Sequence, residues 1–169
     1  MTYPAELVIR YATVKDTSTI LGFIRDLAEY EKLAHEVVAD EAALRATLFG
    51  VRPAAEVLIA ELANQPVGFA LFFQSYSTFL AKPGLYLEDL FVRPEWRGRG
   101  IGQKLFGRVA ALAVDRQCGR MEWAVLDWNA PAIEFYRKRG AEALDGWTLY
   151  RLTGPGLDRA ARPEIAARP

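Results

Sequence analysis

Hydrophobic and polar residues follow two different periods along the first third of the chain. The run from Leu7 to Tyr11 is short, apolar and β-branched, which predicts a strand. Thr13 then offers a hydroxyl cap and Asp16 a carboxylate three residues later, a pattern typical of a capping box at a helix start. Apolar residues recur at helical spacing from Ile20 to Ala28, and a second amphipathic segment runs from Asp40 to Leu48. The pattern predicts a strand followed by two helices.

The middle of the chain has the pattern of strands. Val57–Ala60 and Val67–Phe73 are apolar runs separated by the turn-forming residues Asn64–Pro66, which predicts an antiparallel hairpin. After a loop at Ser75–Pro83, Leu85–Val92 is also strand-like, although two adjacent carboxylates interrupt its apolar character. The hydrophobic pattern alone gives no reason for that interruption.

Helical and extended patterns alternate again in the last third. An apolar stripe from Ile101 to Leu112 predicts a helix, and Met121–Leu126 reads as a buried strand. Asn129 can cap a final helix that carries Pro131 in its first turn and stops at Gly140. Consecutive hairpin strands combined with helical crossovers imply an α/β fold with a mixed sheet and helices on both faces.

The end of the chain is read in two parts. Trp147–Leu152 predicts a closing strand, so we expect a single domain over residues 5–153. Residues 154–169 mix Gly, Pro, Ala and Arg without an apolar face, and we expect a tail that is mobile or docked on a partner.

Composition and charge narrow the classes of function. The 169 residues are 51% hydrophobic, and 21 Lys and Arg balance 21 Asp and Glu, so no overall field favours nucleic acid or anionic lipid. The longest apolar run, Val67–Phe73, is far shorter than the ~20 residues of a membrane span. Cys118 is the single cysteine, and His, Cys and Asp do not cluster at metal-ligand spacing. We therefore expect a cytoplasmic protein that binds neither nucleic acid nor membrane and needs no metal.

A glycine-rich segment, Arg97–Lys104, carries the clearest chemical signal. It places three glycines at alternate positions directly before a helix, where free backbone amides and the helix dipole favour a phosphate. A P-loop would need Lys-Ser or Lys-Thr directly after its last glycine, and a dinucleotide fingerprint would need a glycine at Gln103. A flexible turn is the ordinary alternative to an anion site.

These residues resemble a known family. Arg97-Gly98-Arg99-Gly100-Ile101-Gly102 is similar to the pyrophosphate loop of the GNAT superfamily of acyl-CoA-dependent N-acetyltransferases. Segments resembling the diamine (spermidine/spermine) and thialysine acetyltransferase branch occur in the same order, and the similarity extends over roughly residues 7–152; they are Val8–Arg10, Leu27–Glu31, Tyr86–Val92, Trp128–Tyr136 and Arg137–Ala141. The resemblance implies the GNAT fold, a mostly antiparallel mixed sheet of six to seven strands with a splayed central pair, and a homodimer.

The resemblance also implies a cofactor site. Acetyl-CoA would enter between the splayed strands, pair its pantetheine arm with exposed backbone and place its diphosphate on the glycine loop. The implied cofactor-binding residues are Leu90, Phe91, Val92, Arg97, Gly98, Arg99, Gly100, Ile101, Gly102, Gln103, Asn129, Pro131, Ala132 and Tyr136. A purely capping role for Asn129 remains the alternative.

Acetyl transfer to an amine requires one group that removes a proton and one that supplies a proton. A primary amine with a pKa near 10.4 is almost fully charged at pH 7, and the departing thiolate gains from a donor at its sulfur. The resemblance selects Glu88 as base or amine-orienting group, directly or through a water, and Tyr136 as general acid. Asp89 is expected on the opposite strand face, because neighbouring strand residues alternate. A solvated Glu88 and a core Tyr136 are the ordinary alternatives.

The implied acceptor is a small cationic amine, bound by Tyr30, Glu31, Glu88, Glu122, Trp123 and Ala124. Polyamine enzymes carry an acidic Asp followed by Pro-Trp where this chain has Ser77-Thr78-Phe79, so a diamine or a thialysine- or lysine-like amino acid fits at least as well as a long polyamine. Two alternatives stay open: acetylation of a protein or peptide, and an acyl-CoA sensor without turnover.

Overall fold

A five-stranded sheet forms the centre of the fold. The computed structural model describes residues 6–162, and the strands lie in the order β1-β2-β3-β4-β5. The first three pairings are antiparallel, and β4 pairs with β5 in parallel. The strands are β1 (Leu7–Tyr11), β2 (Glu56–Leu62), β3 (Gln65–Ser77), β4 (Lys82–Val92) and β5 (Met121–Glu122).

The chain divides into two compact units, the first ending at Ala124 and the second beginning at Val125. Each unit contains its own helices. The first unit contains the sheet and three α-helices: α1 (Thr17–Tyr30), α2 (Glu41–Phe49) and α3 (Ile101–Asp115). The second unit contains α4 (Ala130–Arg137) and α5 (Gly154–Ala160).

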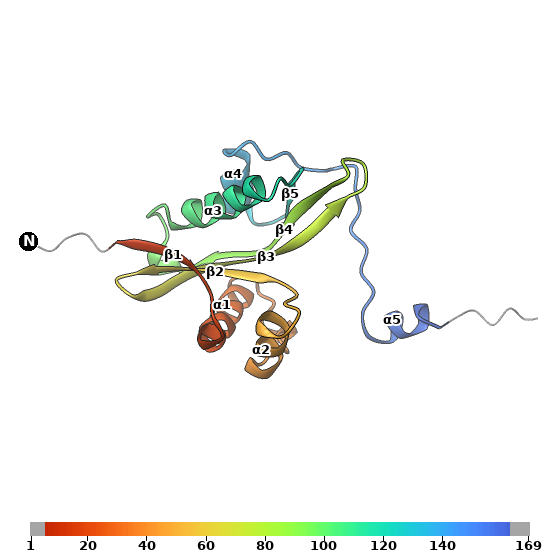
Figure 1. Cartoon of the computed structure of the whole chain (residues 1–169), viewed down its shortest axis with the longest axis horizontal. Coiled ribbons are helices and arrows are strands. Elements are labelled where there is room, and N and C mark those ends of the chain that lie inside the picture. The colour runs from red at the N-terminus through yellow and green to blue at the C-terminus, as the bar shows by residue number, and fades with distance from the viewer. Residues whose placement is uncertain (1–5, 163–169) are drawn as a thin grey trace, which may run out of the picture. The chain divides into compact units, whose positions relative to one another are not determined.

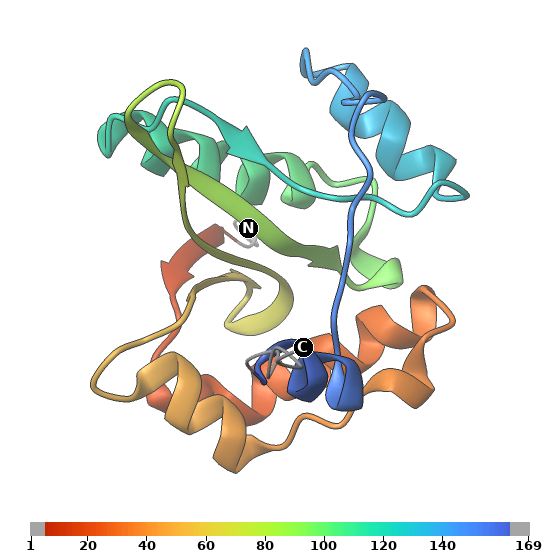
Figure 2. The same ribbon diagram turned by 90° about the vertical axis from the view of Figure 1, so that its right-hand side faces the viewer.

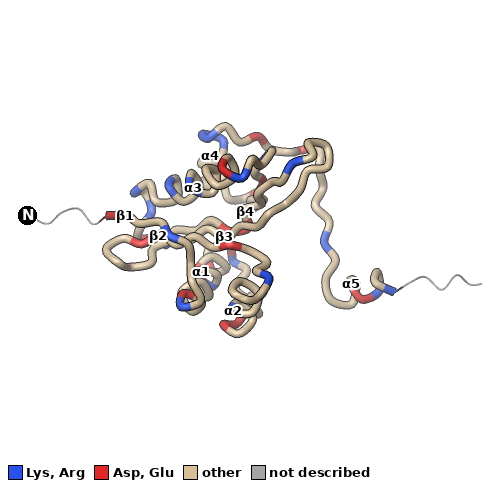
Figure 3. Tube along the Cα trace, viewed as in Figure 1, with Lys and Arg blue, Asp and Glu red and all other residues tan. Residues whose placement is uncertain are grey.

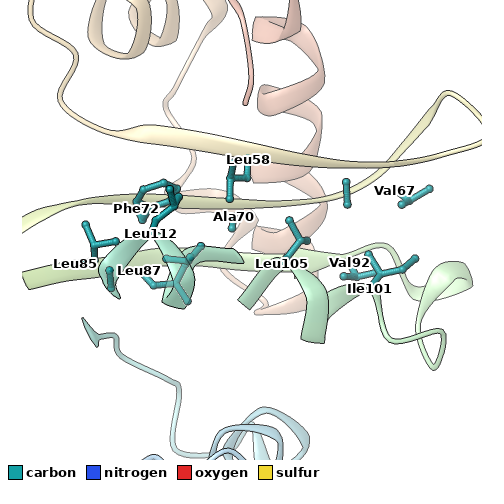
Figure 4. Close-up of a cluster of buried hydrophobic side chains, with 13 residues drawn as sticks. Leu58, Val67, Ala70, Phe72, Leu85, Leu87, Val92, Ile101, Leu105 and Leu112 are labelled. Atoms are coloured by element: carbon teal, nitrogen blue, oxygen red, sulfur yellow. The ribbon is translucent and has the colours of Figure 1, made fainter. Parts of the chain in front are cut away.

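Helices cover both faces of the sheet in the first unit, as the sequence predicts. On one face, α3 packs its apolar stripe, including Leu105 and Val109, against strand residues such as Phe72 and Leu87 (Figure 4). On the other face, α1 and α2 enclose a second core around Phe23 and Phe69, whose rings stack at 5.2 Å. Figures 1 and 2 show α3 on the opposite side of the sheet from α1 and α2.

The entry into α1 is fixed by a polar cluster. The Asp16 carboxylate accepts hydrogen bonds from the Thr13 amide at 2.7 Å and from Arg10 Nη1 at 2.9 Å and Nη2 at 2.8 Å, while Arg10 also donates to Glu61. The expected capping box between Thr13 and Asp16 is present. The Arg10 hydrogen bond is the main reason that the pKa of Asp16 is lowered to about 2.

Several boundaries differ from the sequence-based expectations. The turn of the first hairpin is Ala63–Asn64, both with positive φ, so Gln65 already belongs to β3. Strands β3 and β4 extend to Ser77 and from Lys82, which reduces the loop expected at Ser75–Pro83 to 78–81. These two long strands support each other over ten residue pairs, and such pairing does not depend on local apolar character.

The expected strands near the C-terminus are shorter or absent. The strand predicted at Met121–Leu126 ends at Glu122, and Trp147–Leu152 forms no strand in the described part of the chain. The sheet therefore has five strands rather than six to seven. The apolar pattern of Trp147–Leu152 suits a strand, but strand structure needs a partner edge, which a sequence pattern does not supply. Within the predicted tail, the first residues form α5, and residues 163–169 lie outside the described range.

Candidate active site

The glycine loop has the backbone geometry of an anion cradle. Gly98 and Gly100 have φ of 74° and 76°, a left-handed conformation that favours glycine, and open space surrounds both Cα positions. The first α-helical hydrogen bond of α3 runs from Lys104 N–H to Gly100 O at 3.0 Å. The amides of the residues between them precede the helical ladder and are available for a ligand. The loop thus has the donors that a diphosphate requires.

The two arginines of the loop stack on aromatic rings. Arg97 donates from Nε to Val92 O at 2.9 Å, and its guanidinium lies 4.4 Å from the centre of the Tyr30 ring and 5.5 Å from that of Phe91. Arg99 lies 4.8 Å from the ring centre of Trp96. The structure therefore brings Tyr30, predicted for the amine site, into contact with Arg97 of the predicted phosphate loop.

Strands β4 and β5 pair only at their beginning. Leu85 pairs with Met121 and Tyr86 with Glu122, after which β4 continues to Val92 while β5 ends. Within the described residues, no strand pairs with this edge of β4 beyond Tyr86. The backbone of Leu90–Val92, predicted to bind a pantetheine arm, lies in this unpaired stretch.

A β-bulge lies at the two adjacent carboxylates of β4. Leu71 pairs with Asp89, but the next residue of β3, Phe72, pairs with Leu87, so Glu88 is an extra residue without a partner on β3. The regular alternation assumed for Glu88 and Asp89 is therefore interrupted at Glu88. A sequence pattern with a period of two cannot reveal a bulge, because the bulge is defined by the partner strand.

The bulge reverses the alternation of β4. Leu87 belongs to the core under α3, whereas Phe91, four residues later, belongs to the core under α1 and α2. Asp89 pairs with Leu71, which packs against the α1 side, so the Asp89 carboxylate is on that side as well. Glu88 is exposed, while Asp89 is partly buried.

Asp89 has the most unusual electrostatics of the site. Its pKa is raised to about 7, first by burial and then by the negative charges of Glu88 and Glu31. Burial also raises the pKa of Glu31, which follows directly after α1. Among residues 6–162, no hydrogen bond or ion pair reaches the Asp89 carboxylate. The structure thus brings the predicted residues Glu31 and Glu88 together around a carboxylate that was not predicted.

A pocket lies on the α1 side of the sheet, and its described lining includes none of the three acids Glu31, Glu88 and Asp89. The pocket has a volume of about 560 Å³. Its lining includes Tyr30, which precedes Glu31 in the sequence, and Phe91, which follows Asp89 by two residues. Charged residues from α1 and from the segment after β4 complete it. Its lining is Asp26, Glu29, Tyr30, Phe91, Arg93, Pro94 and Glu95. Arg93 and Asp26 form an ion pair at 2.9 Å across this lining. The pocket has the size for a small-molecule ligand.

The predicted substrate residues on and after β5 have other partners. Glu122 forms an ion pair with Arg120 at 2.8 Å, and Trp123 packs edge-on against Phe106 of α3 in the core under that helix. Ala124 is exposed. Trp123 therefore stabilises the packing of α3, and the structure does not place it with Tyr30 and Glu31.

The second unit carries the predicted general acid. Asn129 accepts a hydrogen bond from the Ala132 amide at 3.3 Å and so caps α4, with Pro131 in the first turn, as the sequence predicts. Tyr136 is partly buried on this helix, and its ring lies edge-on against Phe135 at 5.2 Å. Gly140 has a φ of 82°, consistent with the predicted helix stop.

Part of the basic run after Tyr136 is engaged locally. Lys138 forms an ion pair with Glu134 at 2.6 Å, and Arg139 donates to Phe135 O at 2.6 Å while stacking on that ring. These contacts are typical of basic side chains near a helix C-terminus.

Sequence reasoning missed two features of the site. One is Asp89, whose burial depends on the bulge; the signal was present as a second carboxylate in an apolar strand. The other is the stacking of Arg97 on Tyr30 and Phe91, for which no sequence pattern exists.

A glycine-rich loop before α3, an unpaired edge of β4 and a cluster of carboxylates are features of a nucleotide-cofactor-dependent transferase. Residues 21–141 match the Acetyltransferase (GNAT) family, and the chain belongs to that family. Members of this family use acetyl-CoA as co-substrate, and the chain is accordingly an acyl-CoA-dependent N-acetyltransferase. The expected family and fold class are confirmed.

Curated relatives match nearly the whole chain. A thialysine N-epsilon-acetyltransferase from Bos taurus is 42% identical over 168 residues, covering 93% of this chain and 98% of the relative. An L-ornithine N5-acetyltransferase from Arabidopsis thaliana is 36% identical, covering 88% and 85%. A spermidine/spermine N(1)-acetyltransferase-like protein from Homo sapiens is 35% identical over 85% of this chain, although the match spans 22% of that protein.

Solved structures share the fold. An integron cassette protein from the mobile metagenome of V. cholerae superposes with a TM-score of 0.78 at 26% identity, covering 92% of this chain and 98% of the other. An aminoglycoside acetyltransferase from an uncultured soil metagenomic sample gives a TM-score of 0.73 at 23% identity, covering 87% and 97%, a similarity of fold alone. Separately, none of the described helices is both long and apolar enough to cross a membrane.

Proposed function

We propose that this protein transfers the acetyl group of acetyl-CoA directly to a primary amine of a small cationic substrate: a diamine, a polyamine, or a thialysine- or lysine-like amino acid. The observation that carries this proposal is the pair of left-handed glycines, Gly98 and Gly100, leading into the free amides of α3 beside the unpaired edge of β4. The relatives that act on thialysine and ornithine support an amino acid or diamine acceptor.

Three groups of residues are proposed to bind different parts of acetyl-CoA. The amides and glycines of the loop hold the diphosphate, the edge of β4 pairs with the pantetheine arm, and the start of α4 contacts the same arm. These residues are Leu90, Phe91, Val92, Arg97, Gly98, Arg99, Gly100, Ile101, Gly102, Gln103, Asn129, Pro131, Ala132 and Tyr136. The open space at Gly98 and Gly100 suits a ligand that approaches the backbone closely.

The chemistry requires proton movement at two atoms. The acceptor binds as an ammonium ion and must lose a proton before its nitrogen can attack. Glu88 orients the ammonium and relays its proton, directly or through a water. Tyr136 donates a proton to the departing sulfur. Tyr30 and Glu31 line the amine site; Glu122, Trp123 and Ala124 take part only if their contacts change when substrate binds.

A release assay tests the proposed reaction. Coenzyme A release from acetyl-CoA is followed with a panel of diamines, polyamines, thialysine, lysine and basic peptides. Release with small amines supports the proposal, release only with peptides favours a protein acetyltransferase, and tight acetyl-CoA binding without release to any amine indicates a sensor.

Two substitutions test the assigned roles. Gly100→Val introduces a β-branched residue at a φ of 76° and is expected to abolish acetyl-CoA binding in calorimetry, with Gly107→Ala on the exposed side of α3 as the control. Tyr136→Phe is expected to retain acetyl-CoA binding but lower kcat by about 10²-fold or more. An unchanged kcat would remove Tyr136 from the mechanism.

We also propose a homodimer working in the cytoplasm. The stretch from Leu144 to Leu152 exposes large apolar side chains, among them Trp147 at 79% and Tyr150 at 89%, and such residues are suited to a protein interface. Light scattering coupled to size exclusion tests the dimer, and Trp147→Ser with Tyr150→Ser is expected to shift it to monomer. A monomeric wild-type protein would refute this part.

A further inference from the structure

The carboxylates of Glu31, Glu88 and Asp89 have no cation as a partner among the described residues. Asp89 feels the negative charge of Glu88 from its own strand and of Glu31 from the end of α1. Arg97 is a cation of the same region, but its guanidinium lies over Tyr30 and Phe91 and donates to Val92 O. The ion pairs formed by Arg93 and Arg120 go to Asp26 and Glu122. The three acids therefore share negative charge without a compensating side chain among the described residues.

Such an arrangement is costly for the folded protein. A partly buried carboxylate loses hydration and normally recovers it through a cation or hydrogen-bond donors, neither of which reaches Asp89 within the described residues. Two like charges nearby increase the cost further. An ammonium group bound on this face of the sheet, which also carries Phe91, would supply both the missing charge and the missing donors.

Position distinguishes Asp89 from Glu88. The bulge leaves Glu88 exposed, where water screens its charge, and turns Asp89 toward the side of the sheet that carries α1, Glu31 and Phe91 of the pocket. A proton acceptor for an amine needs a proton affinity close to the working pH, and the pKa of about 7 at Asp89 meets that requirement.

We propose that Asp89 is the residue that binds the ammonium group of the acceptor and takes its proton, while Glu88 acts as a positioning residue that tunes Asp89 and guides the amine. This inference rests on the proposed N-acetyltransferase function and refines it. An N–H bond of the ammonium breaks and an O–H bond forms on Asp89. The freed lone pair of the nitrogen forms the C–N bond to the acetyl carbon, and the C–S bond breaks. Tyr136 gives its proton to the departing sulfur. The nitrogen then loses a second proton, which returns to the Tyr136 oxygen. Asp89 releases its proton to solvent.

The dependence of kcat/KM on pH tests the assignment, measured for the best acceptor between about pH 5 and 9. In the wild type, kcat/KM is expected to rise with pH through about 7 as Asp89 ionises. Asp89→Asn is expected to lower kcat/KM by about 10²-fold or more and to remove that ionisation from the profile. Asp115→Asn, an exposed change on α3, is the matched control and is expected to reproduce the wild-type profile.

Glu88→Gln provides the discriminating measurement. Since the charge of Glu88 raises the pKa of Asp89, its removal is expected to move the ionisation to lower pH while the rise in rate persists. Calorimetry with acetyl-CoA establishes that both variants keep the donor site. The ionisation persisting in Asp89→Asn, or vanishing in Glu88→Gln instead, would overturn the proposal.

Different results would refute the N-acetyltransferase function and the role of Asp89. If the wild type releases no coenzyme A with any amine, the proposed function fails and the role of Asp89 fails with it. If the wild type is active and Asp89→Asn retains its rate and pH profile, only the role of Asp89 is refuted.

Discussion

Two aspartates of the first unit, Asp16 and Asp89, show how differently one residue type behaves in two regions of a single fold. Asp16 lies before α1 and accepts hydrogen bonds from Arg10 and from Thr13, and its pKa falls to about 2. Asp89 lies in the bulge of β4 among Glu88 and Glu31, and its pKa rises to about 7. Both carboxylates are at least partly buried, so burial alone does not explain the difference.

The partners decide what each acid does. Asp16 is stabilised in its charged form by a guanidinium and a backbone amide and therefore holds β1 and α1 together. Asp89 is destabilised in its charged form by burial and like charges, so its ionisation costs stability. A compensated acid such as Asp16 thus stabilises structure, whereas an uncompensated, partly buried acid such as Asp89 is a candidate for binding a ligand. Figure 3 shows that α1 and α2 each carry both acidic and basic residues. The net charge of a helix therefore does not explain why Asp16 is compensated and Asp89 is not.

The largest expected effect is on the structural acid. Asp16→Asn removes the ionic hydrogen bonds to Arg10 and weakens the cap of the following turn, so the free energy of unfolding should fall by about 2–3 kcal/mol. Urea unfolding at neutral pH measures this change, with Asp115→Asn as the control. Equal stability of the two variants would show that the Arg10 cluster does not hold the N-terminal elements together.

The free energy of unfolding of the wild type at acid pH should also reveal the contribution of Asp16. Because the folded pKa of Asp16 lies below its ordinary value of 3.8, the stability it contributes is present above about pH 4 and is lost as the pH falls toward 2. This loss should amount to about 2 kcal/mol at most and should be absent from Asp16→Asn. Unfolding free energies measured across this range provide the check; parallel curves for the two proteins would contradict it.

Asp89→Asn should raise the free energy of unfolding, whereas Asp16→Asn should lower it. A carboxyl whose folded pKa is raised from 3.8 to about 7 leaves stability intact below about pH 4 and reduces it as the pH rises through 7. Removing the charge should therefore stabilise the protein at pH 8, by about 1 kcal/mol after solvent screening, or roughly 2–4 °C in Tm, with little change at pH 4. A lower Tm at pH 8 would show that Asp89 has a stabilising partner.

Glu31→Gln should give the smallest effect. Glu31 is the last of the three causes that raise the pKa of Asp89, after burial and Glu88, so its removal should lower that pKa less than Glu88→Gln does. The shift in the pH profile of kcat/KM, compared between the two variants, tests this order. A larger shift for Glu31→Gln would show that Glu31 interacts more strongly with Asp89 than Glu88 does.

Much of the fold was predictable because its signals are local. The capping box at Thr13 and Asp16, the amphipathic α1 and α2, the hairpin of β2 and β3 and the glycine loop before α3 each depend on residues within a few positions of one another. The strand expected at Trp147–Leu152 was wrong because strand structure needs a partner, and the length of β5 was overestimated for the same reason.

The candidate site was predictable in part. The glycines were found because a left-handed backbone and a helix start both leave a local mark on the sequence. Glu31 and Glu88 were selected by resemblance, and the structure brings both close to Asp89. Trp123 was expected with them but packs on Phe106 of α3, a contact between distant segments that leaves no local mark on the sequence.

The sequence by itself determined the family, the helix caps and the loop that is suited to a diphosphate, since these follow from backbone sterics and hydrogen bonds between near neighbours. Only the tertiary structure decided which of two adjacent carboxylates is uncompensated. Register with β3 creates the bulge, and the end of α1 brings Glu31 to Asp89 from almost sixty residues away. Desolvation and Coulomb interactions depend on distances in space, which the order of residues along a chain does not state.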